Sequence, residues 1–377
     1  MINLFSPAIT QPEIKAAGDT LQSGWIGKGA KVTEFEADWG RHIEAAPEQV
    51  VSTNSCTEAL FTAVNLLDIG PGDEVIIPTI HFIGAAQAVI AAGARPVFCD
   101  VDYRTLNATA KTIAARYSRK TRAVILNHYG GVPCELDWIK EFNGISIIED
   151  AACAPMSTYK AQPIGTFGDI GVWSFDAMKI ITTGDGGMMY FKDKRLADRA
   201  RKMLYLGTST ESGLSSNADK WWEYGVTIKG ARRSIMNDVS AVMGLEQLKR
   251  INRIIDRRLE LYLRYDIAFN TLPVNVPLPH DGQMCSYYFY WIQTTQRDEL
   301  AKYLREQGIY TSFRYYPLHW AYKTGDCLPN AERAARETLL LPLHCNLSDG
   351  EVDYISQCVS GFYSRYSTVT NQPSLSL

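Results

Sequence analysis

The 377-residue sequence lacks the marks of several common protein classes. Basic residues are not in excess: 38 Lys and Arg stand against 41 Asp and Glu, a formal net charge of -3. Nucleic-acid binding needs a basic surface that neutralises phosphates, so we expect no nucleic-acid partner. No apolar run reaches the ~20 residues of a membrane-spanning helix, and we expect no membrane partner. The start, MINLFSPAITQPE, has no basic stretch before a long apolar one, so no secretory signal is expected.

The cysteines are too scattered for a zinc site or a disulfide framework. No two form a CxxC pair, and no Cys/His spacing is typical of zinc, so we expect no metal. A chain of this length does not need disulfides to fold. Reduced thiols and a cytoplasmic location are therefore expected. The eight cysteines are Cys56, Cys99, Cys134, Cys153, Cys285, Cys327, Cys345 and Cys358.

From about residue 48 to 192, short apolar segments alternate with helical patterns. EQVVST, DEVIIP, RPVFCDVD, RAVILNHY and GISIIED are typical of strands, whereas TEALFTAVNLL and FIGAAQAVIAAG are typical of helices. This alternation predicts an α/β fold with a parallel sheet covered on both faces. Ligands bind such sheets at the carboxyl ends of the strands. No G-x-G-x-x-G follows the first strand, which argues against a nicotinamide dehydrogenase.

The second part of the chain predicts a smaller domain. Residues 237–270 have one long helical pattern with an apolar face. We expect this helix to join a large domain, residues 1–245, to a small C-terminal α/β domain, residues 246–366. Residues 367–377 are predicted to be a flexible tail. The segment GTSTESGLSSNADKWWEYG is Gly/Ser-rich and then aromatic, which favours a flap beside a site.

Two stretches offer polar groups where predicted strands end. In STNSCTEAL, a strand leads into a helix whose start carries Ser55, Cys56 and Thr57. Free N–H groups and hydroxyls at a helix start can bind phosphate, although these residues are also ordinary helix caps. In ISIIEDAAC, a strand ends in Glu149 and Asp150. Side chains alternate along a strand, so one acid can face a site; the ordinary alternative is a solvated carboxylate or a cap.

A third stretch, SFDAMKIITTGDGG, places Lys179 among apolar neighbours shortly after Ser174. The lysine could extend its charge from the edge of the core to solvent. Alternatively, it is a desolvated amine of lowered pKa that can form a Schiff base. A phosphate cradle, an acid and a lysine, in that chain order, match the needs of pyridoxal phosphate (PLP). We therefore predict a PLP site.

The motifs NSCTEAL, IIEDAACAPMSTYKAQPIGTFGDIGVWSFDAMKIITTGDGG and YYPLH resemble the DegT/StrS family of PLP-dependent sugar aminotransferases, from about residue 3 to 365. NSCT, MSTYK and PLH are most similar to the branch that aminates dTDP-4-keto-6-deoxyhexoses at C4. The resemblance implies the PLP-dependent transferase fold type I, with a seven-stranded mostly parallel sheet, a small C-terminal domain and a homodimer with shared active sites. It also implies an amino group taken from L-glutamate, which leaves as 2-oxoglutarate, and given to a nucleotide-linked keto sugar.

The resemblance assigns roles residue by residue. It makes Lys179 the Schiff-base lysine and Asp150 the partner of the pyridine nitrogen, both catalytic. The other cofactor contacts are Ser55, Cys56, Thr57 and Ser174 at the phosphate, Phe82 on the ring, and Cys153 and Arg233. We expect the sugar nucleotide near Trp221, Trp222, Arg232, Arg314 and His319, although the tryptophans could be core residues, the arginines solvated and the histidine packed.

The chain departs from the family pattern at three places. Cys153 stands where members have Gln or His, and a thiol is a weaker hydrogen-bond partner. Asp185 replaces a Glu. Arg233 and Ile235 replace an Asn and an Arg, and the Asn normally reaches the cofactor phosphate of the neighbouring subunit. Arg233 could bind that phosphate more strongly.

Two other functions stay open at this point. The enzyme could be a C3 aminotransferase of a dTDP-3-keto sugar, or a non-catalytic regulator that senses PLP or a sugar, because a fold does not determine function. A related dehydratase would carry histidine in place of Lys179.

Overall fold

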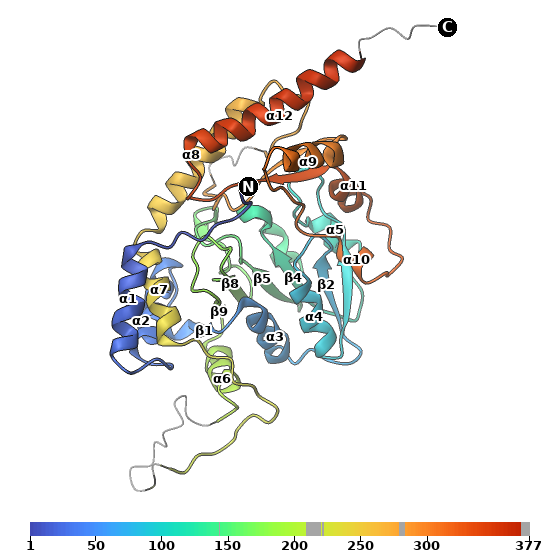
Figure 1. The fold of residues 1–377 in the computed structure, drawn as a ribbon. Coiled ribbons are helices and arrows are strands. Elements are labelled where there is room, and N and C mark those ends of the chain that lie inside the picture. Colours follow the sequence, from blue (N-terminus) through green and yellow to red (C-terminus); the bar gives the residue numbers. More distant parts are fainter. Residues whose placement is uncertain (143, 209–219, 221, 279–282, 371–377) are drawn as a thin grey trace.

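The structure, a computed structural model, describes residues 1–142, 144–208, 220, 222–278 and 283–370, with side chains as far as residue 365. Its centre is one sheet of seven strands (Figure 1). Among these, β9 alone runs antiparallel to its neighbours, and the others are parallel to one another. The predicted fold class is confirmed. In sheet order the strands are β1 (Val50–Thr53), β9 (Gly187–Phe191), β8 (Ile170–Ser174), β5 (Ser146–Asp150), β4 (Thr121–Asn127), β2 (Glu74–Pro78) and β3 (Arg95–Cys99).

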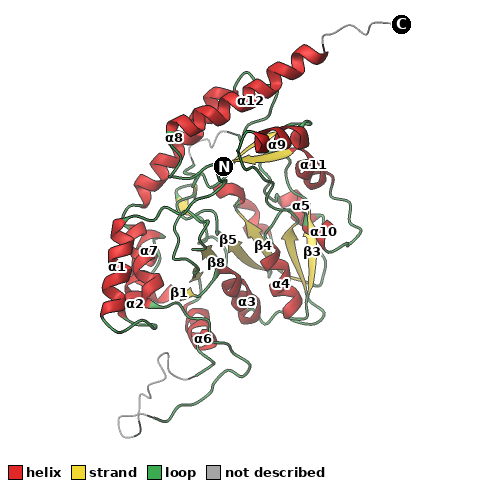
Figure 2. Cartoon of the chain, viewed as in Figure 1, coloured by secondary structure: helices red, strands yellow, loops and turns green. Residues whose placement is uncertain are grey.

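Helices cover this sheet because its strands are apolar on both faces. Figure 2 shows α1, α2 and α7 grouped beside β1, and α3 and α4 side by side. The helices of this part are α1 (Gln11–Gln22), α2 (Ala30–His42), α3 (Cys56–Leu66), α4 (Ile83–Ala91), α5 (Ala110–Ala114), α6 (Lys194–Leu204) and α7 (Asp238–Leu248). Short elements complete it: η1 (Pro47–Gln49), η2 (Tyr129–Gly131), η3 (Asp137–Glu141), β6 (Thr158–Tyr159) and β7 (Gln162–Pro163).

The single helix predicted over residues 237–270 is wrong, because the chain breaks between α7 and α8 (Ile251–Phe269). At the break, Arg250 has a ψ of 17°. Its guanidinium donates hydrogen bonds to Glu13 Oε1 at 2.7 Å and to the carbonyl of Ala8 at 2.5 Å. These contacts tie the break to the N-terminal segment.

A second apolar core lies in the C-terminal part of the chain. It gathers Leu261 and Tyr265 of α8 with residues of the following strands and helices. The division into domains at residue 245 stays a prediction. Helix α12 extends to Thr370, past the predicted start of the tail at 367, and residues 371–377 lie outside the described part. The elements here are β10 (Tyr290–Gln293), antiparallel to β11 (Thr338–Leu341), and α9 (Arg297–Glu306), α10 (Leu318–Ala321), α11 (Pro329–Glu337) and α12 (Asp349–Thr370).

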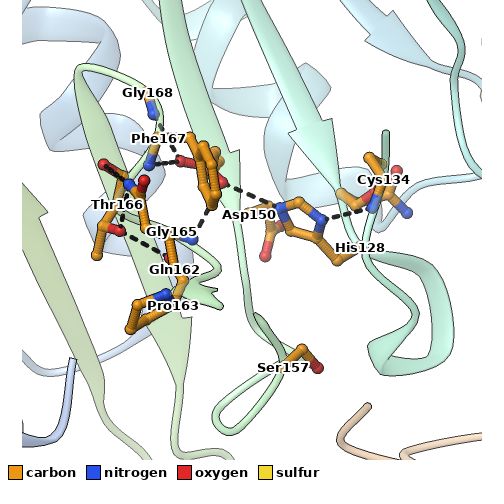
Figure 3. Close-up of polar contacts among 12 residues, drawn as sticks. His128, Cys134, Asp150, Ser157, Gln162, Pro163, Gly165, Thr166, Phe167 and Gly168 are labelled. Carbon is orange, nitrogen blue, oxygen red and sulfur yellow. Dashed lines mark hydrogen bonds and ion pairs between the residues drawn. The ribbon is translucent and has the colours of Figure 1, made fainter. Parts of the chain in front are cut away.

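Glu149 fixes the loop that leads into β8. The side chain is fully buried, and Oε1 accepts hydrogen bonds from the N–H groups of Phe167 (2.7 Å) and Gly168 (2.6 Å). Oε2 accepts one from Gly165 N–H at 3.0 Å and lies 3.3 Å from His128 Nε2. In Figure 3, dashed lines run from the buried carboxylate to Gly165, Phe167 and Gly168 on one side and to His128 on the other. A buried carboxylate with this many donors holds β5, β4 and the loop in one arrangement.

The substitution Glu149→Gln should destabilise the fold. An amide keeps one acceptor oxygen and turns an NH₂ group towards backbone N–H donors, which costs about 1–3 kcal/mol for each donor left unpaired. Urea unfolding measures the loss. As a control, Glu34→Gln removes an exposed ion pair with Lys31 and should cost less than about 0.5 kcal/mol. Equal unfolding midpoints for the two variants would contradict the anchoring role of Glu149.

Candidate active site

The carboxyl ends of several parallel strands meet at one edge of the sheet, and the residues there line a cavity of about 300 Å³. Ser55 follows β1, His81 follows β2, and Asn127, Asp150 and Ser174 end β4, β5 and β8. This edge is where folds of this type place their ligands.

One end of the cavity is the start of α3. Ser55 caps the helix: its Oγ accepts from Glu58 N–H at 3.1 Å, and Ala59 N–H makes the first intrahelical bond, to the Ser55 carbonyl. The N–H groups of Cys56 and Thr57 precede that bond, so they have no intrahelical acceptor and can bind an anion.

Strand β9 comes so close to this helix start that it needs a glycine there. A Cβ on Gly187 would lie 2.7 Å from the amide nitrogen of Cys56. Gly187 is also the register partner of Ser174 on β8, so Ser174 lies beside the start of α3. The structure thus brings the predicted phosphate residues Ser55, Cys56, Thr57 and Ser174 together.

Asp150 lies deeper in the cavity and is 6% exposed. Its Oδ1 accepts a hydrogen bond from Ala152 N–H at 3.0 Å. Its Oδ2 lies 3.5 Å from Nε2 of His81. Of the two adjacent acids on β5, Asp150 therefore lines the cavity, and Glu149 anchors the loop.

Lys179 projects its amine into the same cavity. Its Nζ donates to Cys153 Sγ at 3.5 Å and lies 4.7 Å from the centre of the Tyr288 ring. The expectation of a lowered pKa is wrong. Burial works to lower the pKa of Lys179, but the groups around the amine, Asp150 among them, raise it by more, and the net shift is upward. The raised pKa favours the ammonium form of Lys179.

Two cysteines line the cavity as neutral thiols. Burial raises the pKa of Cys153, although the nearby Lys179 opposes this, and burial raises the pKa of Cys56 well above its usual value. The Cys153 thiol lies beside the Lys179 amine. Asp185, the other departure near the lysine, also lines the cavity.

Aromatic side chains form much of the wall. Phe82, which precedes α4, is 45% exposed, and its ring centre lies 5.8 Å from that of Tyr315, at an interplanar angle of 62°. Tyr288 stacks on Phe5 at 5.6 Å and 12°. No local signal marks His81 or Tyr288, because each reaches the cavity through the tertiary fold. Tyr315 lies in the YYPLH motif, from which only His319 was predicted to bind a ligand.

Of the predicted sugar-nucleotide contacts, Arg314 lines the cavity and His319 does not. The Arg314 guanidinium lies 4.9 Å from the Phe5 ring centre, and Nη2 is 3.8 Å from Met178 Sδ. His319 is 1% exposed: its Nδ1 is 2.7 Å from Thr79 Oγ1, and its Nε2 is 3.5 Å from Glu332. This is the packed histidine of the alternative interpretation.

Three more of the predicted residues, Arg232, Arg233 and Trp222, lie off the cavity wall. Arg232 pairs with Glu58 at 2.8 Å and lies over the ring of Phe61, and Arg233 lies over the ring of Tyr205 at 5.4 Å. Trp222 is 60% exposed. Trp221 lies outside the described residues.

Two kinds of feature are absent from the described residues. No group of three or more His, Cys, Asp or Glu side chains there could hold a metal ion. In the same residues, no helix has both the length and the apolar character needed to cross a membrane.

Comparison with known proteins identifies relatives along almost the whole chain. Residues 7–360 match the DegT/DnrJ/EryC1/StrS aminotransferase family. A dTDP-4-dehydro-2,3,6-trideoxy-D-glucose 4-aminotransferase of Saccharopolyspora spinosa is 47% identical, over 93% of this chain and 94% of the relative. The spore coat polysaccharide biosynthesis protein SpsC of Bacillus subtilis is 36% identical, over 94% and 95%.

Solved structures agree with these matches. The aminotransferase TlmJ of Streptoalloteichus hindustanus is 46% identical, with a TM-score of 0.92 over 97% of this chain and 100% of that one. Spr1654 of Streptococcus pneumoniae, assigned as a sugar aminotransferase, has a PLP form that is 30% identical, with a TM-score of 0.87 over 97% and 99%. The predictions of family, fold, enzyme class and cofactor are confirmed. The chain belongs to the DegT/DnrJ/EryC1/StrS family and is a PLP-dependent aminotransferase.

Proposed function

We propose that the protein transfers an amino group from L-glutamate to C4 of a nucleotide-linked 4-keto-6-deoxyhexose, with dTDP as the nucleotide. The observation that carries the proposal is a cavity that holds an amine, a carboxylate and a helix start together. The 47% identical relative supports the choice of sugar and of C4, since its name specifies a dTDP-4-keto sugar.

The residues of the cavity fit the cofactor. The free N–H groups at the start of α3, with Ser55, Thr57 and Ser174, would hold its phosphate. Asp150 would pair with the ring nitrogen, and Phe82 would cover a face of the ring. When bound, PLP supplies an electron sink beside the reacting carbon.

Lys179 is then the residue that moves protons. Its Nζ would hold the cofactor covalently at rest. Once free, it would take a proton from the substrate carbon that bears the amino group and would deliver a proton to the cofactor carbon bonded to the same nitrogen. The cavity supports this role, because Nζ has a thiol and an aromatic face as neighbours, and neither competes for the proton as a carboxylate would.

Arg314 is proposed to bind the anionic part of a substrate. Its guanidinium contacts a sulfur and an aromatic ring in the described part of the chain rather than a carboxylate, so it can pair with an incoming carboxylate or phosphate.

We further propose that the protein forms a homodimer, in which Arg233 reaches the active site of the partner subunit. Trp25 and Ile26 are 62% and 53% exposed, as suits a surface that a second copy covers. Light scattering should give twice the mass of the chain, and a monomer at working concentration would contradict this. A cytoplasmic location stays a prediction.

A panel of substrates tests the reaction. The purified enzyme, incubated with L-glutamate and dTDP-linked 4-keto or 3-keto deoxysugars, should form an amino sugar from the 4-keto compounds, detected by mass spectrometry and placed at C4 by NMR. Amination of the 3-keto sugar alone would overturn the C4 assignment. No product from any sugar, with PLP bound, would favour a sensing role.

Lys179→Ala should abolish transamination, because no other amine replaces the one that moves the proton. Amino-sugar formation measures this, and Lys194→Ala, which removes an exposed lysine paired with Glu48, should keep the wild-type rate. Reduction of the wild-type enzyme with borohydride should leave the cofactor attached to the peptide that contains Lys179. Attachment elsewhere, or turnover by the alanine variant, would exclude the assignment.

Asp150→Asn should lower kcat by roughly 10²- to 10³-fold, the usual cost of losing one preorganised electrostatic contact. The visible spectrum of the bound cofactor should change with it, since the ring nitrogen loses its anionic partner. Asp137→Asn, at an exposed ion pair with Lys160, is the control. A near-normal rate and spectrum for Asp150→Asn would refute the role of the carboxylate.

A further inference from the structure

The contact between His81 and Asp150 gives the histidine a part in the reaction. His81 is 1% exposed, follows β2 and lines the cavity, and its Nε2 is the nitrogen 3.5 Å from Asp150 Oδ2. We propose that His81 is a positioning residue: its ring carries a proton on both nitrogens and holds the Asp150 carboxylate ionised and oriented towards the cofactor. The inference rests on the role proposed above for Asp150.

The partners of the ring determine where its protons are. Nδ1 lies 2.9 Å from the carbonyl oxygen of Phe82, which can only accept, so Nδ1 carries a hydrogen. A ring with that single hydrogen would turn the lone pair of Nε2 towards a carboxylate oxygen. No hydrogen-bond partner for Nε2 exists in the described part of the chain, and the nearest anion is Asp150. A second hydrogen on Nε2 converts this repulsion into an ion pair.

The carboxylate is then held at both oxygens. Ala152 N–H donates to Oδ1 at 3.0 Å, and His81 lies at Oδ2. Each oxygen keeps a second lone pair, which leaves the carboxylate free to accept from a ligand in the cavity. A buried carboxylate held in this way loses no rotational freedom when the ligand binds.

The other titratable groups near Asp150 do not replace His81. Cys56, Cys153 and Tyr315 act on Asp150 electrostatically, but burial raises the pKa of each, so they are neutral at neutral pH. Lys179 would be joined to the cofactor at rest and freed during the reaction, so its charge beside Asp150 would change as the reaction proceeds. His81 is then the cation that stays with Asp150 throughout the reaction.

Two substitutions separate positioning from simple packing. In His81→Gln, the side-chain NH₂ replaces Nε2 and can still donate to Asp150, but it cannot reach the Phe82 carbonyl. In His81→Asn, the NH₂ replaces Nδ1 and keeps the bond to Phe82, but nothing faces Asp150. A residue that only holds the Phe82 turn is rescued by Asn, whereas a residue that acts on Asp150 is rescued by Gln.

The test measures the release and the visible spectrum of PLP, and not the formation of the amino sugar. We expect the His81→Asn holoenzyme to release PLP on dialysis about 10- to 100-fold faster than wild type, the usual effect of losing a partner that orients a binding group. Its visible spectrum should shift in the direction expected for Asp150→Asn, and His81→Gln should remain near wild type in both measurements. Rescue by Asn and not by Gln, or no effect of either, would overturn the proposal.

A control and a wild-type measurement complete the test. His319→Asn keeps the contact of Nδ1 with Thr79 but removes a similar buried contact of Nε2, to Glu332, outside the cavity, and should lower the melting temperature without changing PLP release. If the His81 variants fail to fold, ¹⁵N NMR of the wild-type holoenzyme with labelled histidine decides. Two N–H signals from His81 at neutral pH support the ion pair, and a single one, on Nδ1, excludes it.

These measurements separate the inference from the proposed function. If the proposed sugar substrate is wrong, the rates of PLP release from the wild type and the His81 variants are unaffected. Normal PLP release and a normal spectrum for Asp150→Asn would show that the role of Asp150 has failed, independently of His81.

Discussion

The site depends on the alternation of side chains at the end of β5, where two carboxylates follow one another. Successive residues of a strand point to opposite faces. Glu149 is turned into the protein and binds the N–H groups of Gly165, Phe167 and Gly168, while Asp150 lines the cavity. The bonds of the first carboxylate therefore hold the strand that presents the second.

Charge in the cavity follows from this arrangement. Asp150 is a carboxylate at the buried edge of the cavity, and the basic side chains of Lys179 and His81 lie near it. Burial alone would favour a neutral lysine, but the surroundings of the amine, with Asp150 among them, reverse the direction of its pKa shift. Local polarity could not be judged from the apolar residues beside Lys179 in the sequence, since the groups that determine it come from β5, from the segment after it and from the C-terminal part of the chain.

Much of the fold and part of the site could be predicted because their signals are local. Apolar segments alternating with helices give a parallel sheet, and Asp150, Ser174 and Ser55 each lie beside a strand end that the sequence marks. Long-range contacts have no such mark. The break at Arg250 comes from a bond to Glu13, and Arg232 is held by Glu58 of α3. His81, Tyr288 and Tyr315 enter the cavity from separate segments. Tyr315 lies in the YYPLH motif, but nothing in the other two segments distinguishes His81 and Tyr288 from core residues.

The two thiols in the cavity have a bearing on chemical selectivity. An aldehyde is open to attack by sulfur as well as by nitrogen, and the attacking species is the thiolate rather than the thiol. Because burial raises the pKa of Cys56 and Cys153, both stay protonated next to Lys179. The two sulfur atoms of the cavity are therefore poor nucleophiles, and a vitamin-derived aldehyde can lie beside them without being trapped as a thiohemiacetal.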